Sequence, residues 1–483
     1  MMTSILLDDE NDKASIDNIT NINSVHETRD SIVTLNEKNK KENHTEQNNE
    51  PENGGEHTSL TIPEDLQRKY INWKKNAKIL YDYLNSNTSK WPSLTCEIFP
   101  DVEIATEKRR ILLSSFTSSQ LPLNESIYIS SISTDIPKSS LNQFDMDEME
   151  FKIDNDVKQG NKKLAKQIEI GFPIGEECNR ARYMPLNPDI IGCASSSGNL
   201  YIYNRTKHGS LPRTRNGMSD GNNIAVQNEI SRDFYEVVYK DEDRHSEAYS
   251  LAWNYQRNGI VATCHADGTV NIWNLSKTYK KSNSKIITTK EHDFFPDIEK
   301  GCNDVSWMVH HESILAVGCE SNNKISIIDT RTNHTPYIKA TDPLSNNTAS
   351  ASGINSVQFN YQNDLLLCSG NSNSRVGVWD LRNMGKPVNS WNHGNTGNSG
   401  SISSVAWNPN ISNVLASAGL NDGLVKIWDA SDIEDPLLFT HGGHMLGVND
   451  ISWDLHDSWL MCSVSNDNSI QIWKPSMKQL MNS

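Results

Sequence analysis

The chain has 483 residues, a formal net charge of −16 and eight cysteines. It contains no run of roughly 18 apolar residues, and its N-terminus lacks the basic-then-apolar pattern of a secretory signal, so we expect neither a membrane span nor secretion. An acidic chain without a stripe of Lys and Arg is a poor direct DNA binder, so we expect no sequence-specific nucleic-acid binding and favour a basic protein partner.

Residues 1–60 form a strongly acidic segment without any Phe, Trp or Tyr. They carry 13 acidic and 5 basic residues and so supply −8 of the net charge. This composition cannot bury enough apolar area to offset chain entropy, and it predicts a disordered tail. Two interpretations stay open: a solvating tail of no particular role, and an acidic segment that engages a basic partner.

Residues 61–88 are predicted to form an amphipathic helix that docks on the rest of the molecule. Apolar residues recur along one helical face, and they are Leu66, Tyr70, Trp73, Ala77, Leu80, Tyr81 and Leu84. Thr61 and Glu64 fit a capping box, and Pro63 lies in the first turn, where a missing N–H costs little. The helix is either a packed accessory or, in addition, one wall of a groove for a partner.

A hairpin unit recurs six times from residue 183 to residue 473. In each copy a large residue that closes one strand is followed, after 20 or 21 residues, by another that closes a later strand. The pairs are Tyr183/Tyr203, Trp253/Trp273, Trp307/Ile328, Phe359/Trp379, Trp407/Trp428 and Trp453/Trp473. An extra residue inside paired strands would turn every side chain to the opposite face, whereas a surface connection absorbs length cheaply. The constant spacing therefore indicates a conserved strand register inside each unit.

Repeats of about 40–50 residues with four strands each are typical of a β-propeller. Residues 91–133 read as three further strands, which would complete an all-β propeller of seven blades over residues 89–475, followed by a C-terminal tail at 476–483. We expect the N-terminal strand region to pair with the last blade, because closing one blade with both chain ends removes an exposed sheet edge. Asp-Gly and Asp-Asn turns precede several strands, as in hairpins.

Two connections, at about 133–177 and 204–246, are long enough to be functional or disordered. No phosphate-binding loop, nucleophile elbow or HExxH motif occurs, so we expect neither an enzyme nor a cofactor. His441 and His444 have metal-like spacing but lack ligand companions nearby, and we expect no metal site. The cysteines form no CxxC pair and mostly lie in apolar runs, which indicates small core residues in a reducing compartment.

Several stretches carry a family resemblance. Residues 378–382 (VWDLR) and 427–431 (IWDAS) contain the Trp-Asp dipeptide of WD repeats, and residues 70–101, 177–191 and 439–475 are more specific. Together they resemble the retinoblastoma-binding family of WD-repeat histone chaperones over nearly the whole chain beyond residue 61. The resemblance implies a nuclear, non-enzymatic subunit of chromatin assembly factor 1 that helps deposit histones three and four on newly replicated DNA, with the cytoplasm as a second location.

The resemblance implies that the first helix of histone four binds between the N-terminal helix and a loop of the penultimate blade. The corresponding residues are Tyr70, Trp73, Ile79, Leu80, Phe439 and Thr440 for the wall, and Asp432, Glu434 and Asp435 for an acidic clamp. This is a helix-in-groove mode in which carboxylates meet Arg and Lys of the guest helix. The loop keeps a single proline, Pro436, and is shorter than is typical of the family, so we expect a weaker clamp.

A second implied site lies on the top face of the propeller, where the family receives a basic histone-three tail. The corresponding residues are Glu177, Arg180, Glu247, Tyr249, Asn303 and Asn355. Asn303, Gly353, Ser401 and Asn466 stand where relatives tend to carry carboxylates, so we expect weaker binding here than at the first site. Alternatives that stay open are a subunit of the type B histone acetyltransferase complex and a general WD-repeat adaptor; in each case the chain would belong to a hetero-oligomer.

Overall fold

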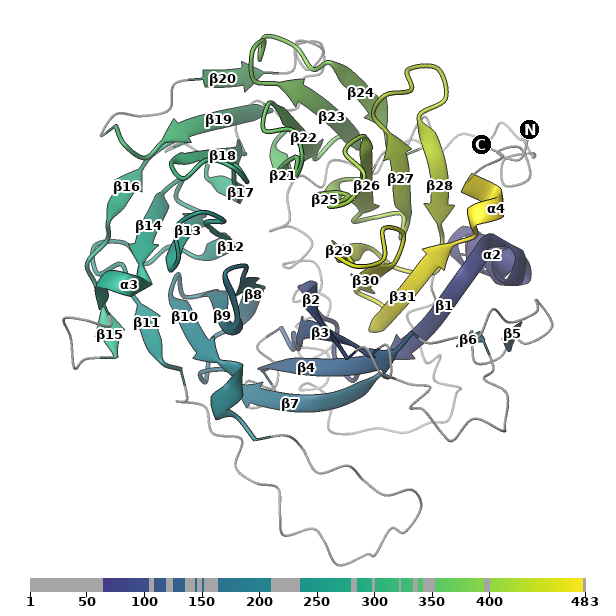
Figure 1. Cartoon of the computed structure of the whole chain (residues 1–483), viewed down its shortest axis with the longest axis horizontal. Coiled ribbons are helices and arrows are strands. Elements are labelled where there is room, and N and C mark those ends of the chain that lie inside the picture. The colour runs from purple at the N-terminus through teal and green to yellow at the C-terminus, as the bar shows by residue number, and fades with distance from the viewer. Residues whose placement is uncertain are drawn as a thin grey trace, which may run out of the picture.

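The computed structural model describes residues 64–103, 108–118, 125–134, 144–145, 150–151, 164–209, 235–278, 285–297, 300–320, 323–332, 338–341, 352–394 and 400–480. The predicted acidic tail lies outside the described residues. Seven sheets of four or five strands are arranged in a ring around a central channel (Figure 1). The prediction of an all-β, seven-bladed propeller with an N-terminal helix is confirmed.

We number the blades in chain order and give their strands from the channel outwards. Blade 1 contains β2 (Cys96–Glu103), β3 (Lys108–Ser114), β4 (Ser126–Ser133) and β7 (Ala165–Gly171). Blade 2 contains β8 (Cys178–Met184), β9 (Asn187–Ser195), β10 (Leu200–Asn204) and β11 (Val237–Tyr239). Blade 3 contains β12 (Ala248–Trp253), β13 (Ile260–His265), β14 (Val270–Asn274) and β16 (His292–Phe294). A short parallel strand, β15 (Ile286–Ile287), extends blade 2.

The later blades follow the same plan. Blade 4 contains β17 (Cys302–Trp307), β18 (Ile314–Cys319), β19 (Lys324–Asp329) and β20 (Ile338–Thr341), and blade 5 contains β21 (Ile354–Phe359), β22 (Leu366–Asn371), β23 (Arg375–Asp380) and β24 (Asn389–Asn392). Blade 6 contains β25 (Ile402–Trp407), β26 (Val414–Gly419), β27 (Val425–Asp429) and β28 (Leu437–His441). Blade 7 contains β29 (Val448–Trp453), β30 (Met461–Ser465), β31 (Ser469–Pro475) and β1 (Tyr81–Thr88).

The remaining elements are short, apart from the N-terminal helix. They are α2 (Glu64–Leu80), β5 (Phe144–Asp145), β6 (Glu150–Phe151), η5 (Arg205–Lys207), α3 (Leu275–Thr278) and α4 (Met477–Leu480). The small β5–β6 ladder lies within the first long connection, and β11 within the second. Among the described residues, no helix has the length and apolarity needed to cross a membrane.

The last blade is completed by β1, which pairs antiparallel with β31. Residues from the two ends of the described chain therefore share one sheet, although the strand that closes it is 81–88, which was predicted to be helical, and the predicted strands at 91–133 form blade 1. The predicted extent of the helix is wrong, however, because α2 ends at Leu80 and residues 81–88 are extended. The free edge of β31 offers this segment a full set of ladder hydrogen bonds, and its run of Asn, Ser and Thr has little helix propensity. The propeller accordingly begins at Tyr81 rather than at residue 89.

The constant spacing of the aromatic residues follows from the register of the inner three strands. In each of the six units, the two large residues flank the same residue of the middle strand. In blade 7, for example, Trp453 and Trp473 both pair with Met461. Blade 1 lacks the spacing because the β2–β3 ladder is interrupted between Ile98 and Val102.

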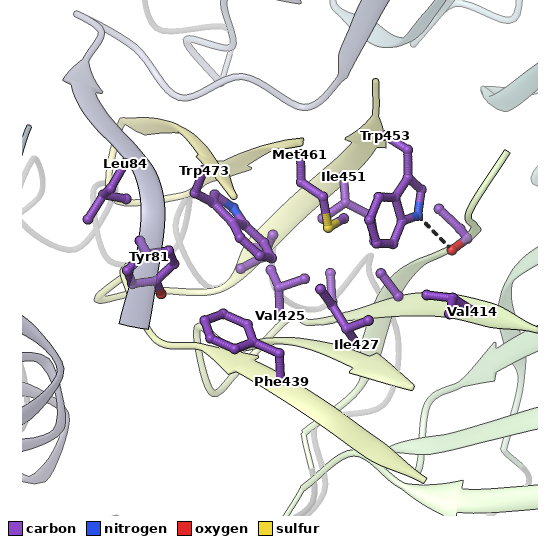
Figure 2. Close-up of a cluster of buried hydrophobic side chains, with 14 of the residues drawn as sticks. Tyr81, Leu84, Val414, Val425, Ile427, Phe439, Ile451, Trp453, Met461 and Trp473 are labelled. Atoms are coloured by element: carbon purple, nitrogen blue, oxygen red, sulfur yellow. Dashed lines mark hydrogen bonds between the residues drawn. The ribbon is translucent and has the colours of Figure 1, made fainter. Parts of the chain in front are cut away.

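The two tryptophans of a unit have different hydrogen-bond partners. The inner one donates to a backbone carbonyl of the preceding blade, as Trp253 does to Arg182 (2.9 Å) and Trp453 does to Ala406 (3.0 Å; Figure 2). The outer one donates to a hydroxyl within its own blade, as Trp473 does to Ser463 (3.1 Å). One indole therefore joins neighbouring blades and the other fixes the strands of a single blade.

The predicted tight turns contain a residue with positive φ at the second position of the turn. Gly268 (φ 81°), Gly423 (φ 68°) and Asn468 (φ 66°) occupy it in blades 3, 6 and 7. Gly and Asn adopt this left-handed conformation at lower cost than other residues. The Asp-Gly and Asp-Asn dipeptides thus mark the turns between the second and third strands, as predicted.

Asp450, on β29, lies in the channel wall and joins blade 7 to three neighbouring blades. Its carboxylate accepts from Thr95 Oγ1 (3.3 Å), the Cys96 amide (2.9 Å), Arg180 (3.0 Å), Arg182 (2.9 Å) and Ser404 Oγ (3.3 Å). Burial opposes ionisation of this carboxyl, but Arg182 and Arg180 outweigh it and hold the pKa of Asp450 below its usual value. The closure of the ring therefore depends on a buried, fully hydrogen-bonded charge.

Asp450→Asn should lower the free energy of unfolding by about 3–5 kcal/mol, because two arginines would lose their shared buried counter-charge. Urea titration monitored by tryptophan fluorescence measures the change. Asp457→Asn, which breaks a more exposed pair with Lys474 (2.7 Å), is the matched control and should cost less than about 1 kcal/mol. Equal losses in the two variants would contradict the role given to Asp450.

Candidate functional site

Helix α2 is attached to the ring by a chain of three side chains. The Trp73 indole donates to the Tyr81 hydroxyl (2.7 Å), and that hydroxyl lies 2.7 Å from Nδ1 of His441 on β28. Because the indole can only donate, the Tyr81 hydroxyl accepts from Trp73, and its own proton remains available for the contact with His441 Nδ1. The first residue of β1 thus holds both the helix before it and the neighbouring blade.

The pair His441 and His444 has a structural role. His441 stacks on Trp473, with ring centroids 4.3 Å apart and an interplanar angle of 2°. Burial holds the pKa of His441 well below its usual value, and the nearby His444 adds to the effect. Within the part of the chain that the structure describes, no group of three or more potential metal ligands occurs.

The C-terminal end of α2 presents apolar surface. Ile79 is 49% exposed, and Leu80 is half-buried against the cluster shared by blades 6 and 7. Tyr70 is also half-buried and packs on Trp73, which is itself buried with only 4% of its surface exposed. Ile79 is therefore the accessible member of the predicted wall, whereas Trp73 supports the helix from beneath.

The three predicted clamp carboxylates are exposed on the loop between β27 and β28. The amides of Glu434 and Asp435 donate to Oδ1 of Asp432 (2.9 and 3.1 Å), which folds the loop into a compact turn. Asp429 anchors the start of the loop by accepting from the amide and hydroxyl of Ser431 (2.8 and 2.6 Å). The loop thus holds a concentrated negative charge in a defined conformation.

Phe439 differs from the prediction, because it belongs to the core. Only 6% of its surface is exposed, and its ring packs against those of Tyr81 and Trp473, with ring centroids 5.4 Å and 5.9 Å away (Figure 2). Strand alternation explains this: Phe439 and His441 point inwards from β28, and the half-buried Thr440 between them points the other way. Phe439 therefore supports the surface and does not line it.

Sequence reasoning missed three apolar residues in this region. Ile433 is 77% exposed at the tip of the acidic loop, and Leu438 and Leu480 are half-buried next to the cluster that contains Phe439. Leu480 comes from α4, which lies beside α2 in Figure 1. Ile433 could have been found from the sequence, because it is the one large apolar residue within the acidic run from Asp432 to Asp435. Leu480 could be placed only by the fold.

On the top face, the predicted asparagines connect neighbouring blades. The side-chain amides of Asn303 and Asn355 donate to the carbonyls of Ile354 (3.1 Å) and Ile402 (2.8 Å). Asn179 and Asn449 make the same contact from blades 2 and 7. Tyr249 holds the corresponding position in blade 3. The four asparagines therefore serve first to join the ring.

A carboxylate that sequence reasoning missed lies beside Asn303. Glu320 Oε2 accepts from the Asn303 amide at 2.6 Å. A Cβ at Gly353 would lie 2.5 Å from the same oxygen, so the glycine leaves room for the Glu320 carboxylate. The charge expected at position 353 is thus replaced by one from the end of β18, and the top face is less depleted than the sequence implied.

The other predicted top-face residues differ in their surroundings. Glu177 and Glu247 are half-buried just before β8 and β12, and Glu247 accepts from Asn179 (2.8 Å). Arg180 points into the channel wall, where it pairs with Asp450. The channel encloses a cavity of about 150 Å³ with mainly polar walls. Arg180 therefore contributes to ring closure, while Glu177 and Glu247 add to the negative charge that Glu320 brings to this face.

The fold and its aromatic spacing define a WD-repeat propeller with a helix docked on its last blades. The family of the histone-binding protein RBBP4, whose description also names a subunit of the CAF1 complex, matches residues 68–136, from α2 into blade 1. The WD domain, G-beta repeat matches residues 239–274, and the N-terminal domain of Nucleolar protein 10-like proteins matches residues 286–477.

The histone-binding protein MSI1 of Saccharomyces cerevisiae is 48% identical to this chain over 430 residues. The match covers 87% of this chain and 96% of the relative. The chain therefore belongs to the WD-repeat family of histone-binding proteins, as its sequence motifs indicated.

Tyr81→Phe should lower the free energy of unfolding by about 1–3 kcal/mol, because Trp73 and His441 would both lose their buried partner. Chemical denaturation measures the loss. As a control, Tyr83→Phe removes a hydroxyl whose contact to the Ser133 carbonyl is longer (3.4 Å), so this variant should lower the free energy of unfolding by less. If Tyr81→Phe proves neutral, the hydrogen-bond chain does not hold the helix.

The His444 network makes stability depend on pH. Nδ1 and Nε2 of His444 contact the hydroxyls of Ser469 (2.6 Å) and Ser463 (2.7 Å), and burial lowers its pKa to about 4 against the opposing effect of Asp467. Between about pH 6.5 and pH 4, the unfolded chain binds a proton here that the folded chain does not, so this residue makes stability fall as pH falls.

His444→Gln should remove that contribution. The slope of unfolding free energy between pH 6.5 and 4 should become shallower by up to about 1.4 kcal/mol per pH unit. Burial raises the pKa of Glu97 to about 8 and that of Glu125 to about 7; these carboxyls act in the opposite direction, but equally in both proteins. The exposed His245→Gln, outside the network, is the control. An unchanged slope in His444→Gln would contradict the assignment.

Proposed function

We propose that this chain is a non-enzymatic, nuclear histone-binding subunit of chromatin assembly factor 1. In this role it binds the first helix of histone four and presents histones three and four to the other subunits for deposition on newly replicated DNA. The observation that carries the proposal is the combination of accessible apolar surface at the end of α2 with a compact acidic loop on the adjoining blade. Family membership supports the same assignment.

The chemistry of the two elements suits an amphipathic basic helix. Ile79 and Ile433 would contact its apolar side, and Asp432, Glu434 and Asp435 would meet Arg or Lys along one edge. Exposed carboxylates mainly raise the association rate and the specificity, while apolar burial slows dissociation. A histone helix carries both kinds of side chain on opposite faces, so it can satisfy both elements at once.

A weaker second contact is proposed for the top face. Glu177, Glu247 and Glu320 would receive the basic tail of histone three. Two of these carboxylates already accept from asparagines of the ring, which reduces the number of free acceptor sites. We therefore rank this face below the α2 surface for affinity.

Neutralising the loop should weaken histone binding. The triple variant Asp432→Asn, Glu434→Gln, Asp435→Asn should reduce affinity for a histone three–four complex by roughly three- to a hundredfold at low salt, given that exposed pairs contribute about 0.2–1 kcal/mol each. Fluorescence anisotropy with labelled histones measures the change, and Ile79→Asp should add to it. Phe439 is unsuitable for this test because it is in the core.

The matched control is Glu242→Gln, Asp243→Asn, Glu312→Gln, which removes the same charge from exposed positions on blades 3 and 4. If both triple variants weaken binding equally, only the net charge matters and the proposed site is wrong. A subunit of the type B histone acetyltransferase complex would use the same surface. Co-purification with the large subunit of chromatin assembly factor 1, or instead with the acetyltransferase, distinguishes the two assemblies.

A further inference from the structure

Helix α2 has a second face, directed away from the propeller, that is both cationic and apolar. Its residues Arg68, Ile71, Lys75 and Lys78, here called the outer ridge, are all exposed, and Ile71 is 50% accessible. Their spacing places them on the side of the helix opposite the buried Trp73 and Ala77. Figure 1 places α2 at the outside of the ring, so blade packing leaves this face uncovered.

The positive charges of the outer ridge are not neutralised by the propeller. Within the described part of the chain, Arg68, Lys75 and Lys78 form no ion pair. Elsewhere many exposed cations are paired, for example Lys207 with Glu236 (2.7 Å) and Lys277 with Glu291 (3.0 Å). In a chain of net charge −16, an unpaired cationic surface of this kind calls for a negatively charged occupant.

The sequence directly before the helix has the complementary charge. Residues 42–63 contain five glutamates and neither Lys nor Arg, and residues 66–80 contain five basic residues and neither Asp nor Glu. The glutamates are Glu42, Glu46, Glu50, Glu52 and Glu56. The charge therefore changes sign at the start of α2.

The chain is long enough to bring these segments together. Lys78 lies about 21 Å along the axis from Glu64, at 1.5 Å per residue. Glu56 precedes Glu64 by eight positions, and this stretch can span up to about 27 Å. A chain that folds back over the helix can therefore place Glu56 near Arg68, and Glu50 or Glu52 near Lys75. No propeller strand has to move.

We propose that residues 42–56 of the acidic tail dock on the outer ridge of α2 in the same molecule. The glutamates pair with Arg68, Lys75 and Lys78, and the chain between them covers Ile71. Each exposed ion pair is weak, but the short tether gives the tail an effective concentration of roughly millimolar or higher, which favours the intramolecular contact over competing polyanions. The tail would thus lie over the outer ridge of α2 within the same molecule.

Zero-length cross-linking of the full chain tests the proposal without any histone. A water-soluble carbodiimide joins a Glu carboxylate to a Lys amine as an amide, and takes up the released water as its urea. We expect mass spectrometry to find links from Glu46, Glu50, Glu52 or Glu56 to Lys75 and Lys78. Their yield should fall at least about fivefold from 0.1 M to 1 M salt, because the Debye length shrinks from about 10 Å to about 3 Å.

Lysines elsewhere provide the comparison. Lys300 and Lys386 are exposed on blades 4 and 5 and should form at most one-fifth as many links to the tail. Reversing the charge of these two lysines, in Lys300→Glu/Lys386→Glu, should leave the tail–helix contact unchanged. Protection of residues 42–56 from a protease that cleaves after Glu measures that contact. Lys75→Glu/Lys78→Glu should abolish that protection, and adding Glu50→Lys/Glu52→Lys should restore it at Glu46 and Glu56, two cleavage sites that every variant keeps.

Two outcomes would overturn the proposal. One is equal linkage of the tail to Lys75, Lys78, Lys300 and Lys386. The other is linkage between copies, which a mixture of isotopically heavy and light chains would reveal. Because the experiment contains no histone, its failure would leave the proposed histone site untouched, and loss of histone binding in the loop variants would leave the tail contact untouched.

Discussion

The ladder between β1 and β31 is the contact on which the rest of the structure depends. Each of blades 1 to 6 takes its four main strands from one stretch of the chain, but blade 7 takes its outer strand from a segment nearly 400 residues earlier, as in the pairing of Leu84 with Trp473. The ring therefore closes only when both ends of the domain are in place. Asp450 makes the same closure on the channel side, where it joins blade 7 to blades 1 and 2.

The candidate histone surface is a consequence of this closure. Helix α2 continues directly into β1, so the position of the helix is fixed as soon as the strand has paired. Tyr81 takes part in both the strand and the helix contact: it is the first residue of β1, and its hydroxyl accepts a hydrogen bond from the indole N–H of Trp73. Most of the stability of a helix within a protein comes from tertiary packing of its apolar face, which α2 obtains from blades 6 and 7. The surface on which binding is proposed is therefore stable only as part of the closed ring.

Polar side chains on this protein divide between joining blades and carrying charge. The asparagines of the inner strands satisfy carbonyls of the next blade, and some of them also hold carboxylates such as Glu247 and Glu320. The acidic loop before β28 is different, since it organises its own turn and leaves most of its charge exposed. The contrast explains why the candidate histone surface, formed by the end of α2 and this acidic loop, has carboxylates available for a basic guest, whereas the top face has fewer.

The sequence by itself determined the architecture, because strand register is a local property. The spacing of Trp453 and Trp473 follows from their common partner Met461, and the Asp-Gly turns follow from the need for positive φ. It also located the acidic loop and the amphipathic start of α2. These signals lie within a few tens of residues and need no knowledge of the fold.

Only the tertiary structure decided where the helix ends, which residues line the surface and how the top face is charged. The segment after Leu80 has an apolar pattern compatible with helix or strand, and the free edge of β31 selects the strand. Phe439 is buried because Tyr81 and Trp473, both distant in sequence, enclose it, and Glu320 enters the top face because Gly353 leaves space. Each outcome depends on contacts between distant segments, which no local pattern encodes.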